Sequence, residues 1–167
     1  MFTSYQLLHS EVLDPLHTLL AIALELPEDY FRNIHKYEVK SEDHLRYMKY
    51  TKFTSEENAA IGDSWVRAHT GACFLSYRMR TLVTSPLADL GSFTLLFRQP
   101  VAALQIRDPI HNEWKWVKPQ DATLTVNACD AMSFLTGGYV KSTIHRYEFS
   151  NDIWICLPVV LSEPAPF

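Results

Sequence analysis

The first apolar residues of the chain recur at intervals of three and four positions. This spacing predicts an amphipathic helix from Ser4 to Leu26 whose apolar side packs across the outside of a sheet. Pro15 interrupts the pattern, so either the helix kinks there or Asp14 caps a second helix with Pro15 in its first turn. The segment Leu26 to Asp29 then ends the helix and begins another short one. The apolar positions of the first helix are Leu8, Val12, Leu16, Leu19, Leu20 and Ala23.

The rest of the chain alternates in short runs rich in Val, Ile, Thr and aromatic residues, a pattern typical of β-strands. Turn residues such as Asp108-Pro109, Pro119-Gln120 and Gly137-Gly138 separate these runs. Several strands at such spacing predict a β-sandwich or barrel, with His and Asp residues at its mouth as the place for chemistry. The predicted strands lie within His44–Tyr50, Ser64–His69, Asp89–Phe97, Leu104–Asp108, Val126–Asp130, Lys141–Arg146 and, in the tail, Ile153–Val160.

Composition narrows the functional classes. At 167 residues and 19.2 kDa, with 47% hydrophobic and 20% charged residues, the chain is predicted to fold as one globular domain, residues 1–167. A net charge of -4 and a pI near 5.9 argue against nucleic acid or an anionic membrane as partner. Three isolated cysteines indicate neither a disulfide framework nor a thiolate zinc site. No apolar run reaches the ~18 residues of a membrane span, so we expect a cytoplasmic protein.

The residue sequence of four segments is informative beyond the spacing of their apolar positions. They are WVRAHT (65–70), DLGSFTLLF (89–97), LQIRD (104–108) and VNACDAMSFLTGGYVKSTIHR (126–146). In this order they resemble the C-terminal catalytic half of iron(II)- and 2-oxoglutarate-dependent oxygenases of the isopenicillin N synthase-like group. The resemblance covers most of residues 3–146, and the N-terminal region of about a hundred residues that the group usually carries is absent.

The resemblance implies a mainly β fold, a double-stranded β-helix of the jelly-roll or cupin-like type with the N-terminal helix packed outside. It also implies oxidation of a small organic molecule by Fe(II), with 2-oxoglutarate as co-substrate and dioxygen as oxidant. The group binds iron through two His and one carboxylate, written H-x-D followed by a distant His, which leaves three positions on the metal open. His69, Asp89 and His145 match these ligands. The other histidines have no such context and are expected on the surface or on a helix face: His9, His17, His35, His44 and His111.

One departure from the group lies directly after His69-Thr70, where Gly71 stands in place of the expected Asp. The sequence that resembles the group resumes only at Asp89, so residues 71–88 are predicted to be an 18-residue insertion. Closing such a loop costs about 2.6 kcal/mol, which still allows His69 and Asp89 to meet at a metal. We expect the insertion to be a translated, in-frame intron. An alternative is a metal site with Gly71 in the carboxylate position, as in iron halogenases.

The second departure lies in the tail. The group carries, on the strand after KSTIHR, an Arg that pairs with the distal carboxylate of 2-oxoglutarate, whereas residues 147–167 contain neither Arg nor Lys. Lys141, predicted on the same side of its strand as His145, is a candidate substitute, as is Arg107. Tyr50 matches a position whose Tyr reaches the co-substrate in many members. The alternative to an enzyme is therefore a truncated or mis-spliced oxygenase fragment that acts at most as a metal-binding module.

Overall fold

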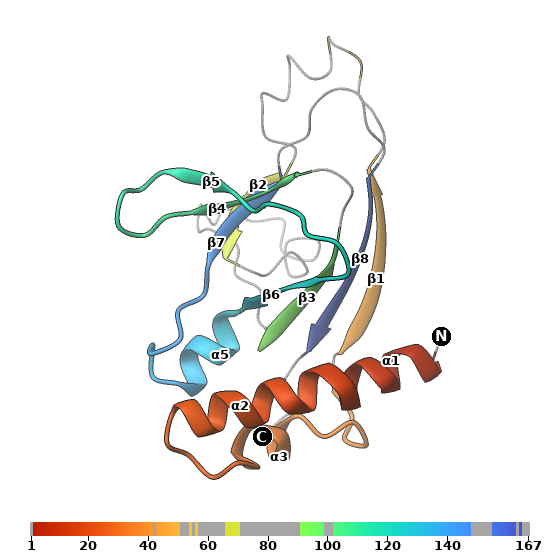
Figure 1. Ribbon diagram of the computed structural model, residues 1–167, viewed down its shortest axis with the longest axis vertical. Helices are drawn as coiled ribbons and strands as arrows, with labels where there is room; N and C mark the ends of the chain where they lie inside the picture. Colours follow the sequence, from red (N-terminus) through yellow and green to blue (C-terminus); the bar gives the residue numbers. More distant parts are fainter. Residues whose placement is uncertain are drawn as a thin grey trace, which may run out of the picture.

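The computed structural model describes residues 2–41, 43–50, 66–70, 91–98, 102–147 and 155–162, together with Thr54, Glu56 and Pro164. Five helical segments and eight strands lie in these ranges (Figure 1). The helical segments at the N-terminus are α1 (Phe2–Leu8), the π-helical η1 (His9–Leu13), α2 (Asp14–Ala23) and α3 (Tyr30–Ile34), and a further helix, α5, spans Asp130–Leu135. The strands are β1 (His44–Tyr50), β2 (Val66–Thr70), β3 (Phe93–Phe97), β4 (Leu104–Arg107), β5 (Trp114–Trp116), β6 (Leu124–Ala128), β7 (Ile144–Tyr147) and β8 (Ile155–Ser162).

The strands form two four-stranded sheets, and every described pairing is antiparallel. The first sheet has the order β1-β8-β3-β6 and the second the order β2-β7-β4-β5. Neighbouring strands are therefore often distant in sequence. The tail strand predicted over Ile153–Val160 is confirmed as β8, and it lies between β1 and β3 in the middle of the first sheet.

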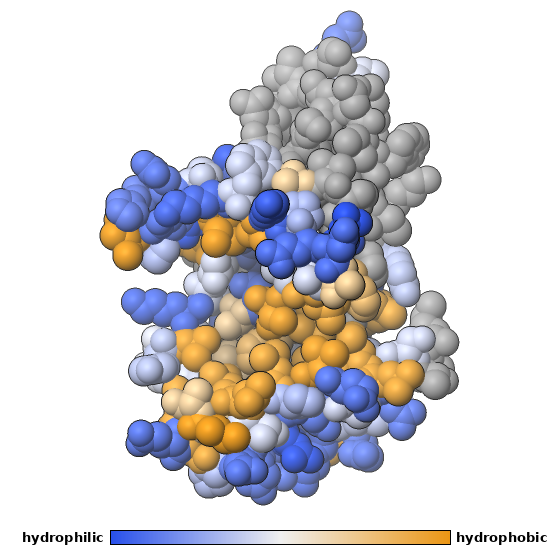
Figure 2. Space-filling model, viewed as in Figure 1, coloured by the Kyte–Doolittle hydropathy of each residue, from blue (hydrophilic) through white to orange (hydrophobic). Residues whose placement is uncertain are grey.

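The N-terminal helical row, formed by α1, η1 and α2, crosses the lower part of the first sheet (Figure 1). Its buried residues pack with the apolar side of β3 and with α5, which confirms the predicted position of the helix outside a sheet. Figure 2 shows apolar residues gathered where the helical row meets this sheet, and mainly hydrophilic residues on the β4–β5 hairpin. The fully or nearly buried core consists of Leu13, Ala21, Phe31, Phe93, Leu95 and Met132.

Pro15 is accommodated inside the helical row. Asp14 has helical backbone angles, φ −59° and ψ −48°, and is the first residue of α2 rather than its cap, so the capping alternative is wrong. The backbone N–H of Asp14 donates to the carbonyl of His9, five residues back. This wider π-helical turn precedes Pro15, which lacks an N–H and would crowd the carbonyl four residues before it in a regular α-helix.

Three histidines in the helical region are buried. His9 is 3% exposed, His17 0% and His35 3%, so a surface position is wrong for all three. His9 and His17 do lie on a helix face, because they share one helical stripe with Leu13 and Ala21 at a spacing of four residues. They fell outside the predicted apolar stripe only because their side chains are polar.

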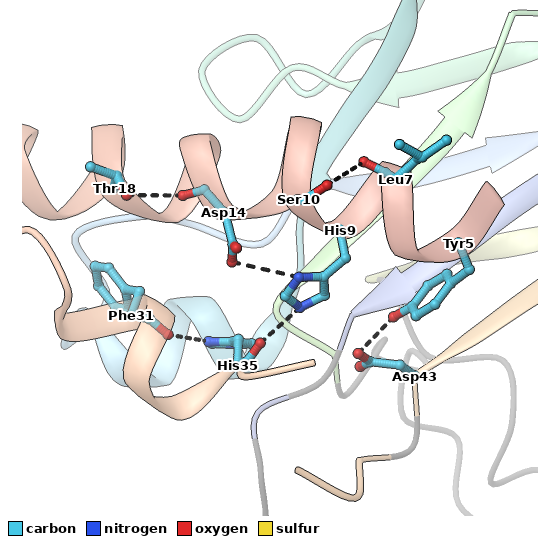
Figure 3. Close-up of polar contacts among 9 residues, drawn as sticks. All are labelled: Tyr5, Leu7, His9, Ser10, Asp14, Thr18, Phe31, His35 and Asp43. Carbon is cyan, nitrogen blue, oxygen red and sulfur yellow. Dashed lines mark hydrogen bonds and ion pairs between the residues drawn. The ribbon is translucent and has the colours of Figure 1, made fainter. Parts of the chain in front are cut away.

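His9 and His35 join the helical row to α3 (Figure 3), and His35 also bonds to Ser92 just before β3. His9 Nε2–H donates to the carbonyl of His35 at 2.8 Å. The Nδ1–H of His35 donates to the carbonyl of Phe31 at 2.7 Å, and Ser92 donates its hydroxyl proton to His35 Nε2 at 2.6 Å. Tyr5 donates to Asp43 Oδ2 at 2.7 Å beside this network.

Two elements were not predicted, and one strand begins later than expected. The three-residue β5 and the six-residue α5 are too short to show a period of their own. β7 begins at Ile144, so Lys141 lies in the irregular segment before it and its predicted place on the strand of His145 is wrong. Among the described helices, none combines the length and the apolar character that crossing a membrane requires.

Candidate metal centre

Two of the three predicted iron ligands lie on neighbouring strands. His69 in β2 and His145 in β7 are direct register partners, and the register shifts between Val66 and His69. Residues that face each other in an antiparallel pair lie on the same side of the sheet, with Cβ atoms roughly 4.5–5.5 Å apart. The strand pairing therefore brings the two predicted histidine positions together, although they are far apart in sequence.

His145 faces the first sheet. Leu104 and Ile106 of β4 are opposite Tyr147 and His145 of β7, which places Leu104 and His145 on one side of the second sheet. Leu104 lines a small cavity together with Leu96 from β3, so this side is the one turned toward the first sheet. The predicted metal ligand thus projects into the space between the two sheets.

The hydrogen bonding of His145 suits a metal ligand. The residue is 9% exposed, and its Nδ1–H donates to the carbonyl of Thr143 at 3.0 Å. A carbonyl can only accept, so Nδ1 carries a proton, and in the neutral ring Nε2 is the nitrogen that can coordinate a metal. An imidazole that is oriented through one nitrogen and coordinates through the other is the usual arrangement of a metal-binding histidine.

The opposite side of β7 is held by Arg146. Its Nε–H donates to Gln105 Oε1 at 2.6 Å, and its guanidinium lies over the ring of Trp114, 4.2 Å from the centroid. Gln105 is only 5% exposed. These contacts fix which side of β7 faces the first sheet, and therefore the direction of His145. Neither Gln105 nor Trp114 was predicted as a site residue, because only the β4–β5–β7 pairing brings them to Arg146.

The remaining predicted site residues stay predictions. Asp89 and the proposed insertion, residues 71–88, lie outside the described residues. Tyr50 is opposite Ile155 at the end of β1, and Lys141 is exposed. In the described ranges, which exclude Asp89, no group of three His, Cys, Asp or Glu side chains is placed to hold a metal ion.

Comparison with known proteins identifies the family. The model of the 2OG-Fe(II) oxygenase superfamily matches residues 42–152, two thirds of the chain. The chain belongs to this superfamily. The matched segment contains strands of both sheets and all three predicted metal ligands. The N-terminal helical row lies before it.

Curated relatives are longer than this chain. UPF0676 protein C1494.01 of Schizosaccharomyces pombe is 33% identical over 136 residues, which make up 80% of this chain and 36% of that protein. The 2-oxoglutarate-dependent dioxygenase iboH of Amanita muscaria is 37% identical over 68 residues, 40% of this chain and 32% of that one. The chain thus spans about a third of the length of these two relatives.

Solved structures confirm the double-stranded β-helix fold. A full-length Neurospora crassa protein, in complex with alpha-KG, superposes with a TM-score of 0.71 at 21% identity, covering 98% of this chain and 50% of that one. The dioxygenase for auxin oxidation 1 of Arabidopsis thaliana, in a 2-oxoglutarate complex, gives a TM-score of 0.70 at 19% identity, covering 98% and 51%. The superfamily uses Fe(II) and 2-oxoglutarate, and the buried, oriented imidazole of His145 opposite position 69 fits such a metal.

Proposed function

We propose that this chain is the catalytic core of an oxygenase that oxidises a small organic molecule with Fe(II), 2-oxoglutarate and dioxygen. The observation that carries the proposal is the register pairing of His69 with His145 inside the segment that the superfamily model matches. His69, Asp89 and His145 would hold the iron, which supplies the oxidising chemistry when bound. Three protein ligands leave room on a six-coordinate metal for the keto acid and for dioxygen.

The chain's own residues have positioning roles in this proposal. The Thr143 carbonyl and the Arg146 contacts keep the His145 ring aimed between the sheets, with Nδ1 as its hydrogen-bond donor. The predicted insertion separates His69 and Asp89 in sequence, so the approach of Asp89 to the other two ligands is the step most open to failure. A fragment that binds metal without activity is therefore the competing outcome.

The substrate class rests on the solved neighbours. The same Neurospora crassa protein has been solved with thymine and with 5-formyluracil, and JOX2 has been solved with 2OG, Fe and JA. These proteins bind small organic molecules, and we extend that coarse class to this chain. The chain spans about half of each of these structures or less. Contacts that select one substrate can therefore come from regions outside the part that this chain matches.

Anaerobic titration with Fe(II) and 2-oxoglutarate tests the proposal. Chelation of the metal by the keto acid gives a weak visible absorption band, which we expect for the unaltered chain and not for His145→Ala. His111→Ala is the matched control, because His111 is exposed in the turn between β4 and β5. A folded protein that gives no band contradicts the proposal.

A second variant distinguishes a defective core from a wrong assignment. A chain without residues 71–88 and with an Arg-bearing C-terminal strand restores the features that the superfamily resemblance predicts. If only this variant gives the band, the chain has the family's site in a non-functional form. If neither gives it, the assignment of His69 and His145 as ligands is wrong.

A further inference from the structure

A hollow between the helical row and α3 lies outside the candidate metal centre. All the residues that line it precede the segment matched by the superfamily model, and it holds about 430 Å³. That volume is within the range of small-molecule sites in proteins. The helical row contributes His9 and Asp14, and α3 with its flanking residues contributes Asp29, Arg32, Asn33, Lys36, Tyr37 and Glu38.

The wall of the hollow on the side of the helical row is packed. His9 is 3% exposed, its Nε2–H donates to the carbonyl of His35, and its ring is in edge contact with Tyr37, with centroids 5.5 Å apart. Asp14 Oδ1 lies 3.6 Å from His9 Nδ1. Figure 3 shows both side chains on the side of the helical row that faces α3. This wall is therefore held in place before any ligand arrives.

Charges of both signs line the hollow. Three carboxylates, those of Asp14, Asp29 and Glu38, are joined by two cations, Arg32 and Lys36. Among the described residues, neither of these cations makes an ion pair or a side-chain hydrogen bond. The opposite charges of the hollow therefore do not pair with one another. Such an arrangement suits a ligand that itself carries both signs of charge.

Exposure alone does not leave a cation of this chain unpaired. Arg98 at the surface pairs with Asp121 at 2.5 Å, and Lys115 pairs with Asp108 on the β4–β5 hairpin. In the hollow, the residue three positions before Arg32 is an acid, at a spacing that permits a pair on a helix. The carboxylate of this acid instead accepts a hydrogen bond from the Asn33 side chain at 2.8 Å. The Arg32 guanidinium is thus left for another anion.

We propose that this hollow binds a small basic amino acid, at a site independent of the metal centre. The carboxylate of the ligand binds Arg32 and Lys36 through charge-assisted hydrogen bonds. Its ammonium groups bind Asp14 and Glu38 in the same way. The lining has one carboxylate more than it has cations, so a ligand with two ammonium groups and one carboxylate balances its charge. The polar lining argues against a lipid or an uncharged aromatic ligand.

Isothermal titration calorimetry with three related amines tests this charge pattern. L-Lysine has two ammonium groups and a carboxylate, 6-aminohexanoate lacks the α-ammonium group, and cadaverine lacks the carboxylate. We expect L-lysine to bind saturably, with one molecule per chain. Each of the other two amines should bind about tenfold more weakly, because each lacks one charge-assisted contact.

Two pairs of matched variants locate the site. Lys36→Gln and Glu38→Gln each remove one charge from the hollow and should weaken L-lysine binding by about tenfold. Lys118→Gln and Glu113→Gln make the same exchanges on either side of β5, outside the hollow, and should leave binding unchanged. All four side chains are exposed, so thermal unfolding without ligand should be alike in all variants. If one hollow variant fails to fold, the other still decides.

A ligand in the hollow should also change a local signal. The side-chain amide of Asn33, which donates to Asp29 on the lining, should shift in nitrogen–proton NMR spectra as L-lysine is added. The same ligand joins the helical row to α3, so it should raise the temperature of thermal unfolding.

Three results would overturn the inference. One is the absence of saturable binding at millimolar L-lysine. Another is equal binding of cadaverine, because that amine has no carboxylate for the two cations. The third is equal weakening in the hollow variants and in their controls, which would show non-specific attraction of a cation to an acidic chain. None of these results bears on the iron site, because the variants and the amines leave the predicted metal ligands unchanged.

Discussion

Replacement of His17 by Leu should make the protein less sensitive to acid. The His17 side chain is fully buried, its ring stacks on His35 with centroids 4.2 Å apart, and neither ring nitrogen has a hydrogen-bond partner in the described part of the chain. Burial, followed by the positive charges that His35 and His9 would carry, lowers the pKa of His17 from 6.5 to about 2. The ring is therefore neutral in the folded protein throughout the physiological pH range.

The direction of the pH effect follows from this pKa. Between about pH 6.5 and pH 2 the unfolded chain binds a proton at His17 that the folded chain does not, so the free energy of unfolding falls as the pH falls. Above pH 6.5 His17 is neutral in both the folded and the unfolded chain, so its protonation does not lower the free energy of unfolding there. From pH 7.5 to pH 5.5 the loss from His17 alone is about 1.4 kcal/mol. Burial also lowers the pKa of His35, against the opposing effects of the Phe31 carbonyl and Asp43, so His35 adds to the loss.

His17→Leu removes the titrating group and keeps a side chain of similar volume. At pH 7.5 we expect unchanged or slightly higher stability, because a buried polar group without a partner costs about 1–3 kcal/mol. Between pH 7.5 and pH 5.5 the variant should lose about 1.4 kcal/mol less than the unaltered chain. Leu19→Met, an exposed and non-titrating exchange in the same helix, is the control.

Urea unfolding at a series of pH values measures these differences. Tryptophan fluorescence reports the transition, and EDTA removes the pH dependence that metal binding would add. Equal acid loss in His17→Leu and in the unaltered chain would refute the assignment of a depressed pKa to His17. A decrease of more than about 2 kcal/mol at pH 7.5 would show that the ring nitrogens have a stabilising partner.

Two further contacts give predictions about stability. Tyr5→Phe removes the hydrogen bond to Asp43 between the helical row and the segment before β1, so the free energy of unfolding should fall by about 1–2 kcal/mol, as urea unfolding would show; no change would mean that water replaces the bond. Arg146→Lys loses the Nε–H bond to Gln105 and the stacking on Trp114 and should cost about 1 kcal/mol in the same assay. Because Arg146 sets the direction of His145, that variant should also weaken the Fe(II)–2-oxoglutarate band, whereas Arg98→Gln should not.

Local patterns in the sequence were sufficient for much of the fold. The apolar stripe of the N-terminal helix is confirmed, and so are the strands containing Phe93–Phe97 and Leu104–Arg107, because the helical spacing and the strand-forming runs between turn residues are local signals. The motifs around His69 and His145 indicated the family, and the superfamily match confirms it. Their roles as ligands, with Asp89, remain predictions.

Other features depend on contacts between distant segments. The sequence showed that the tail can form a strand, but only the sheet pairing places β8 between β1 and β3. The direction of His145 depends on Gln105 and Trp114, which lie on other strands and are far from it along the chain. No local pattern encodes such a pairing.

The buried histidines show most clearly the difference between what local sequence patterns predict and what contacts between distant segments decide. The helical spacing of His9 and His17 was visible in the sequence, yet a polar side chain on an apolar stripe can face water or the core with equal local regularity. Their burial depends on His35, whose carbonyl accepts from His9 and whose ring stacks on His17 from outside the helical row. The sequence by itself determined most of the elements and the family, because short-range periodicity and motifs are local. The tertiary structure decided which polar groups are buried and which strands share a site, because both depend on contacts and hydrogen bonds between residues far apart in the chain.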